Sequence, residues 1–110
     1  MSPRGHLMKR YQGRRAPDGA IVTVDGQPLD PRLDRRNHSP AGFDWGHGGS
    51  GPAQLALAIA TDHFGGEVGE SIYQDLKWGV IAKIGTDEWT ITSWEIGDWY
   101  AETFPSGWGF

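Results

Sequence analysis

The residues best suited to chemistry lie in one glycine-rich segment in the middle of the chain. The side chains there that could bind a ligand or react are His38, Asp44, His47 and Ser50, with Gly49 next to the serine. An imidazole, a carboxylate and a hydroxyl are the groups of a nucleophilic site. Glycines also let a backbone approach a partner closely. The segment could therefore bind a small molecule or a nucleotide, or form a small active site.

The known patterns for such chemistry are incomplete in this segment. A nucleophile elbow has glycine two residues after the serine, where this chain has Pro52. A phosphate-binding loop has a lysine and a serine or threonine after its last glycine, and no such pair follows Gly51. The spacing of the possible metal ligands matches no familiar motif; they are His38, Asp44, His47, Asp62 and His63. The sequence thus predicts no catalytic residue, no cofactor and no metal, and favours a structural turn in which Ser50 caps a helix.

A second unusual region combines aromatic and acidic residues near the carboxyl end. After Lys83 the chain has no basic residue. Indole and phenol rings surrounded by carboxylates suit a partner rich in arginine and lysine. We therefore predict that this region binds a protein with a basic surface, and its candidate residues are Glu95, Asp98, Trp99, Glu102 and Trp108. The alternative is a helix over 93–102 with solvated acids on one side and Trp94 on the opposite, buried side.

Charge is distributed unevenly along the chain. Residues 1–40 carry eight basic and four acidic side chains, whereas residues 41–110 carry two and ten. The two parts, with net charges of +4 and −8, could face each other in the fold and partly neutralise. The arginines of the first part could instead contact phosphate. The whole chain has a net charge of −4, however, so we expect no direct binding to nucleic acid.

The strands of the predicted fold lie at both ends of the chain. Turn-forming residues at 16–19 separate two strands, over 7–15 and 20–25, and a second turn is predicted at 25–28. Alternation over 88–92 predicts a third strand. Residues 30–49 have no period of strand or helix, which predicts a long irregular loop.

Three helices are expected to complete the fold. Gly51 as N-cap and Pro52 at the first helical position start a helix that ends near residue 64. Its stretch from Leu55 to Ala60 has no charged residue, which predicts a helix buried on most sides. Apolar residues recurring every fourth position from Ile72 predict a second helix over 67–84. A capping box of Thr92 and Glu95 begins a short last helix that ends near residue 102. The sequence thus predicts an α+β fold, with a small antiparallel sheet of about three strands packed against two main helices plus a short C-terminal helix.

Length and composition indicate one domain over residues 1–110. Residues 1–6 could form a disordered arm, and residues 103–110 an aromatic tail. The chain has no cysteine, no apolar run long enough to cross a bilayer and no secretory signal. We therefore expect a cytoplasmic protein that does not bind membranes. The sequence carries no signal for its oligomeric state.

Several motifs resemble those of a small family of unknown function found in bacteria, plasmids and phages. They are VTVDG at 22–26, NHSP at 37–40, GFDWG at 42–46 and GGSGPAQLA at 48–56. The resemblance brings no known activity or catalytic residue, but it implies a setting in mobile DNA, where small proteins often bind host machinery.

Two hypotheses about function follow from these observations. The first is a non-enzymatic interaction module that inhibits a host nucleic-acid-handling or defence complex, an anti-CRISPR-type inhibitor being the concrete case. The second is a small-molecule or nucleotide-binding domain, or a small enzyme, centred on the glycine-rich loop from His38 to Ser50.

Overall fold

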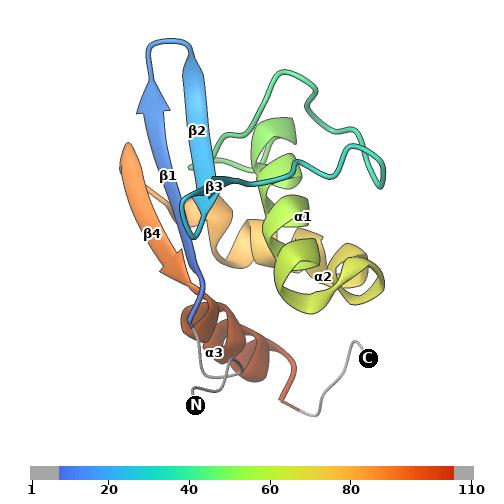
Figure 1. Ribbon diagram of the computed structural model, residues 1–110. Coiled ribbons are helices and arrows are strands. Elements are labelled where there is room, and N and C mark those ends of the chain that lie inside the picture. The colour runs from blue at the N-terminus through green and yellow to red at the C-terminus, as the bar shows by residue number, and fades with distance from the viewer. Residues whose placement is uncertain (1–7, 106–110) are drawn as a thin grey trace.

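One antiparallel sheet and a pair of helices form the two layers of the fold (Figure 1). The computed structural model describes residues 8–105. Its strands, in the order β3-β2-β1-β4 across the sheet, are β1 (Arg10–Ala16), β2 (Gly19–Val24), β3 (Gln27–Pro28) and β4 (Glu88–Thr92). Its helices are α1 (Ser50–Phe64), α2 (Gly66–Gly79), the short 3₁₀ turn η2 (Ile81–Lys83) and α3 (Ser93–Thr103).

The predicted α+β class is confirmed, with one strand more than expected. The additional strand, β3, has two residues and lies where the sequence predicted part of a turn. Predictions for residues 1–6, for the start of the first strand at residue 7, for Trp108 and for the tail beyond 105 fall outside the described residues. Phe104 is described; its side chain is buried against Trp99 and Tyr100.

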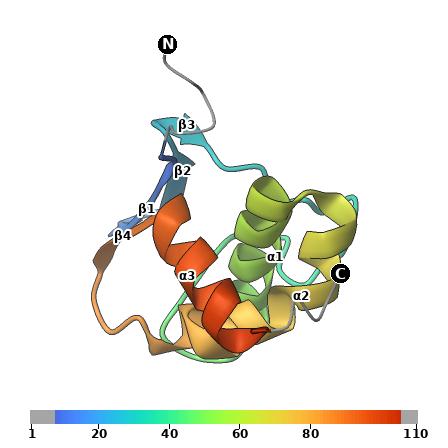
Figure 2. The same cartoon turned by 90° about the horizontal axis from the view of Figure 1, so that it is seen from below.

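Successive residues of the central strand β1 alternate between the helices and the outer face of the sheet. Tyr11 and Gly13 face the helices and are buried, whereas Gln12 and Arg14 are exposed on the other face. Tyr11 lies opposite Val24 on β2 and Ile91 on β4. Figures 1 and 2 show α1 and α2 on one side of the sheet only.

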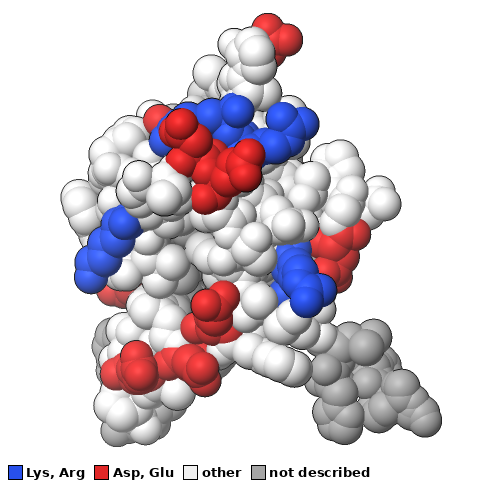
Figure 3. Space-filling view, turned by 90° about the vertical axis from the view of Figure 1, so that its left-hand side faces the viewer, with Lys and Arg blue, Asp and Glu red and all other residues white. Residues whose placement is uncertain are grey.

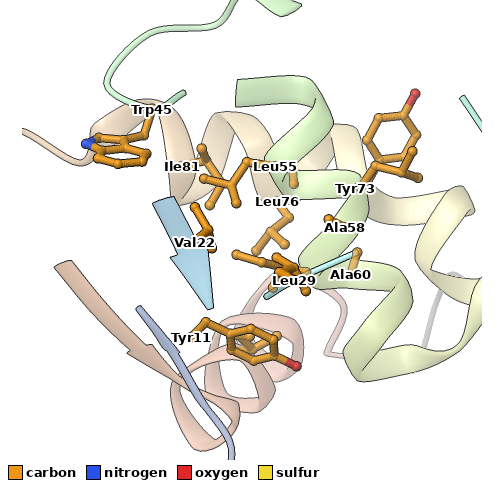
Figure 4. Packing of buried hydrophobic residues seen from close by; sticks show 14 residues of the cluster. Tyr11, Val22, Leu29, Trp45, Leu55, Ala58, Ala60, Tyr73, Leu76 and Ile81 are labelled. Atoms are coloured by element: carbon orange, nitrogen blue, oxygen red, sulfur yellow. The ribbon is translucent and has the colours of Figure 1, made fainter. Parts of the chain in front are cut away.

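The first helix passes through the centre of the molecule, as its uncharged stretch from Leu55 to Ala60 predicted. Every residue from 52 to 61 is buried. Alanines let its neighbours approach closely, and Gly69 of α2 lies directly against the backbone of Ala60 and Thr61. Leu55, Leu76 and Val22 meet in the core between the helices and the sheet (Figure 4).

Two helix boundaries differ from those the sequence predicted. The N-cap of α1 is Gly49, so Ser50 is already helical and Pro52 stands at the third position instead of the first. Helix α2 ends at Gly79 and is followed by η2, whereas the repeat predicted a helix to residue 84. The indole of Trp99 fills the space where a side chain at Gly79 would stand. The apolar repeat continues because Val80 and Ile84 still pack against the core, although the backbone there is no longer α-helical.

The last helix begins as predicted. The Thr92 hydroxyl accepts a hydrogen bond from the Glu95 amide, and the Glu95 carboxylate accepts one from the Thr92 amide, which completes a capping box. Because Thr92 also ends β4, no loop separates this strand from α3. The helix lies at one end of the two layers (Figure 1).

Candidate functional site

The glycine-rich loop brings Asp44 and His47 together, but it uses both side chains to hold itself in place. One oxygen of Asp44 accepts hydrogen bonds from Arg15 at 2.6 Å and from the Trp45 amide at 2.8 Å, and the other contacts Nε2 of His47 at 2.9 Å. The second ring nitrogen of His47 accepts a hydrogen bond from the Gly49 amide at 3.1 Å. Because Nδ1 accepts this hydrogen bond, Nε2 carries the ring proton and donates a hydrogen bond to the Asp44 carboxylate.

The electrostatics of Asp44 fit this structural role. Partial burial by itself would raise the pKa of Asp44, but hydrogen bonds from His47, Arg15 and the Trp45 amide lower it to about 2. The carboxylate is therefore ionised at neutral pH, and its lone pairs are occupied by neighbours from the same fold.

Ser50 does not complete a nucleophilic site with these groups. A serine nucleophile needs a base whose free nitrogen accepts the hydroxyl proton. Both nitrogens of His47 already have partners, and Ser50 is an exposed residue in the first turn of α1. The helix has no side-chain cap, so the interpretation of Ser50 as a cap is wrong.

His38 lies at the other end of the loop and also has a structural contact. Its Nε2 is 2.7 Å from the hydroxyl of Tyr73 on α2. Its amide and that of Ser39 both donate to the side chain of Gln54, at 2.7 and 3.0 Å. The structure therefore places His38 against α1 and α2, separately from the pair formed by Asp44 and His47.

Packing explains several of the loop glycines. A Cβ at Gly48 would fall 2.1 Å from the ring of Trp78, and one at Gly51 would fall 2.6 Å from Cβ of Asp44. At Gly46 the backbone has a φ of +85°, which L side chains rarely adopt. Glycine is therefore required at these three positions, where the Trp78 ring, Asp44 and the Ile84 carbonyl lie against the loop or the start of α1.

The possible metal ligands do not converge. Within residues 8–105 no group of three or more histidine, aspartate or glutamate side chains is placed to hold a metal ion. Asp62, at the end of α1, accepts hydrogen bonds from Lys9 at 3.0 Å and from the Tyr11 hydroxyl at 2.7 Å. Burial and the neighbouring Asp62 raise the pKa of Tyr11, so this hydroxyl stays protonated and donates.

The two oppositely charged parts of the chain do face each other in the fold. Within residues 8–105, five ion pairs join a base before residue 41 to an acid after it; they are Lys9–Asp62, Arg15–Asp44, Arg15–Asp87, Arg35–Glu70 and Arg36–Glu70. This pairing neutralises acids near the sheet, the loop and α2. It does not extend to α3, since no described base forms an ion pair with Glu95, Asp98 or Glu102.

The exposed side of α3 carries one aromatic ring among three acids, and we call these four residues the acidic α3 face: Trp94, Glu95, Asp98 and Glu102. The Trp94 side chain is 62% exposed. Trp94 and Asp98 are four residues apart and share a side of the helix. Figure 3 shows acidic side chains gathered in the lower part of this view, where α3 lies.

The placement of the tryptophans differs from the sequence-based alternative. Trp94 was expected on a buried side and is instead among the most exposed apolar residues. The buried side of α3 is formed by Ile96 with Trp99, which packs partly against the core. Trp99, predicted to bind a partner, therefore offers only part of its ring. The four-residue spacing between Trp94 and Asp98 was the signal that could have identified Trp94.

Comparison with known proteins gives a family but no activity. No curated protein and no solved structure matches the chain. None of the described helices is long and apolar enough to cross a membrane. Residues 11–102, from the central strand to the end of α3, match the family of unknown function DUF6166, and the chain therefore belongs to that family.

Proposed function

We propose that this protein is a non-enzymatic interaction module that binds a basic surface of a nucleic-acid-handling or defence complex through the acidic α3 face. One observation carries the proposal: Trp94 is 62% exposed beside carboxylates that have no basic partner among the described residues. A large exposed ring next to uncompensated charge is typical of a binding anchor.

The charge of this face indicates the kind of partner. Surfaces that bind nucleic acid carry stripes of lysine and arginine that neutralise phosphates. A row of carboxylates with an indole at one end can occupy such a stripe, with the indole also able to stack on arginine. The expected consequence is inhibition, because the partner cannot hold nucleic acid and this protein on the same surface. An effector of a CRISPR system is the concrete case.

The position of Glu102 also supports a role in binding. It lies in the last turn of α3, where the helix dipole disfavours a negative charge by about 0.3–1 kcal/mol. A local cost of this kind is expected at functional positions. It also makes charge reversal a safe test, since lysine at this position should favour the helix.

The test compares two double variants that change the net charge equally. Asp98→Lys with Glu102→Lys alters the acidic α3 face, and Asp18→Lys with Asp75→Lys alters exposed acids on the hairpin and α2. Tagged proteins capture partners from a host lysate, and mass spectrometry quantifies what each retains. A captured protein supports the proposal only if the α3 variant loses it, the control keeps it, and wild-type protein displaces nucleic acid from it. Equal capture by both variants, or undisturbed nucleic-acid binding, would refute the proposal.

A further inference from the structure

In the part of the chain that the structure describes, the sheet ends in a strand whose outer edge is unpaired. In the order β3-β2-β1-β4, strand β4 is flanked by β1 on one side, and no other described strand pairs with it. Figure 1 shows this strand at the left-hand margin of the sheet, away from α1 and α2. An edge of this kind offers backbone groups to another chain unless it is protected.

The register identifies which backbone groups point outward. The Arg15 amide donates to the Asp87 carbonyl, and the Ser93 amide donates to the Lys9 carbonyl. In an antiparallel ladder the bonded pairs alternate, so Trp89 and Ile91 also turn their backbone groups toward β1. Glu88 and Thr90 therefore turn theirs to the free edge.

Three of these outward groups have no partner among residues 8–105. The Glu88 carbonyl accepts a hydrogen bond from the Thr86 hydroxyl, and the Thr92 amide is used by the capping box. The Glu88 amide and both backbone groups of Thr90 are left, on residues that are exposed. They are the groups that one added strand would use.

The side chains of β4 define what such a strand should carry. Trp89 and Ile91 face the core and are only partly buried, so apolar residues beside them would extend the inner face. Glu88 and Thr90 face outward, where they line a concavity of about 530 Å³ with Gln12 and Arg14 of β1. An added strand would therefore alternate apolar residues with residues that suit Glu88.

Charge decides between a second copy of this chain and a different partner. The acidic α3 face follows β4 directly, so a strand beside β4 continues toward Asp98. No basic residue occurs anywhere from 84 to 110. Two antiparallel copies paired through this edge would place Glu88 of each copy toward the start of the other's α3, acid toward acid, whereas a basic strand would neutralise these charges.

We propose that the partner of the acidic α3 face adds one extended segment, with alternating apolar and basic residues, to the free edge of β4. This inference rests on the proposed function and specifies how the partner binds. Main-chain hydrogen bonds to Glu88 and Thr90 hold the segment, and its basic side chains reach Glu88 and the acids of α3.

Proline at position 90 provides a selective test. The Thr90 amide points outward, so Thr90→Pro removes a donor from the free edge and leaves the ladder with β1 intact. Thr90→Ala is the matched control, because it keeps the amide. The probe is a synthetic nine-residue peptide that alternates lysine and valine. A peptide that alternates lysine and proline has comparable charge but cannot pair as a strand.

We expect the lysine–valine peptide to bind the wild-type protein more tightly than the lysine–proline peptide. Thr90→Pro should weaken this binding about tenfold, and Thr90→Ala should leave it unchanged. Amide exchange in the wild-type protein is a second measurement, independent of whether the proline variant folds. The peptide should slow exchange at Glu88 and Thr90, whereas Trp89 and Ile91 are already protected by β1.

The outcomes separate the two proposals. If Asp98→Lys with Glu102→Lys abolishes binding while Thr90→Pro binds as the wild type does, the acidic α3 face stands and edge pairing is refuted. If only Thr90→Pro weakens binding, edge pairing stands and the role of the α3 acids is refuted. Absence of protection at Glu88 and Thr90 at saturating peptide also refutes edge pairing.

Discussion

Replacing Gln54 with leucine tests whether one buried amide holds the long loop against α1. Gln54 is fully buried and uses every hydrogen-bonding group of its side chain. Its oxygen accepts from the amides of His38 and Ser39, and its nitrogen donates to the carbonyls of Pro31 at 2.6 Å and Arg36 at 3.0 Å. Leucine has a similar size and none of these groups, so the variant removes the hydrogen bonds without leaving a large cavity.

The expected destabilisation follows from the number and exposure of these bonds. A hydrogen bond contributes about 1 kcal/mol net, and a buried group left without a partner costs about 1–3 kcal/mol. Pro31 and His38 are only partly buried, so water can satisfy some of the groups that lose Gln54. We therefore expect Gln54→Leu to lower the free energy of unfolding by about 3 kcal/mol. For a domain of this size that corresponds to a fall in Tm of about 12 °C.

Urea titration and thermal melting, followed by tryptophan fluorescence, measure this change. Gln74→Leu on the exposed side of α2 is the control and should change the free energy of unfolding by less than about 0.5 kcal/mol. Amide exchange at His38 and Ser39 should become faster in Gln54→Leu only. A loss below about 1 kcal/mol, with exchange at these amides unchanged, would refute the idea that Gln54 holds the loop.

Two further predictions concern packing and pH. Gly69→Ala should lower the free energy of unfolding by about 1–3 kcal/mol, because its Cβ would fall 2.6 Å from the backbone of α1. Gly97→Ala in α3, with open space around the new Cβ, should instead raise it by about 0.5–1 kcal/mol in the same urea titration. Equal effects of the two substitutions would contradict the close contact between α1 and α2. The pKa of Asp44 falls from 3.8 to about 2 on folding, so its contribution to stability is complete above pH 4 and lost as the pH falls through 2. After allowance for solvent screening, the difference in free energy of unfolding between the wild type and Asp44→Asn should narrow by about 1 kcal/mol from pH 5 to pH 2. A constant difference would show that the hydrogen bonds to Asp44 do not stabilise the folded state.

Much of the fold could be predicted because its signals are local. The capping box joins Thr92 and Glu95, three residues apart, and both groups of the pair are visible in the sequence. The uncharged stretch from Leu55 to Ala60 likewise predicted a helix buried on most sides. The start of α1 was placed two residues too late, because Pro52 is tolerated within the first turn as well as at its first position.

The chemistry of the candidate sites depended on contacts between residues distant in the chain. His38 meets Tyr73 across 35 positions, and Arg15 meets Asp44 across 29. A histidine and an aspartate in a glycine loop suit both a reactive site and a structural one. Their partners decide between the two, and those partners belong to other elements.

The sequence by itself determined the class of the fold, the order of most of its elements and the excess of acid after residue 83, because each depends on neighbours along the chain. Only the tertiary structure decided that four bases of the first part pair with acids of α1, the loop and α2, and that no described base forms an ion pair with the acids of α3; the four bases are Lys9, Arg15, Arg35 and Arg36. It also decided that Trp94 is exposed and that β4 is an edge. The physical reason is that exposure and ion pairing depend on which elements cover one another, and local sequence does not encode that arrangement.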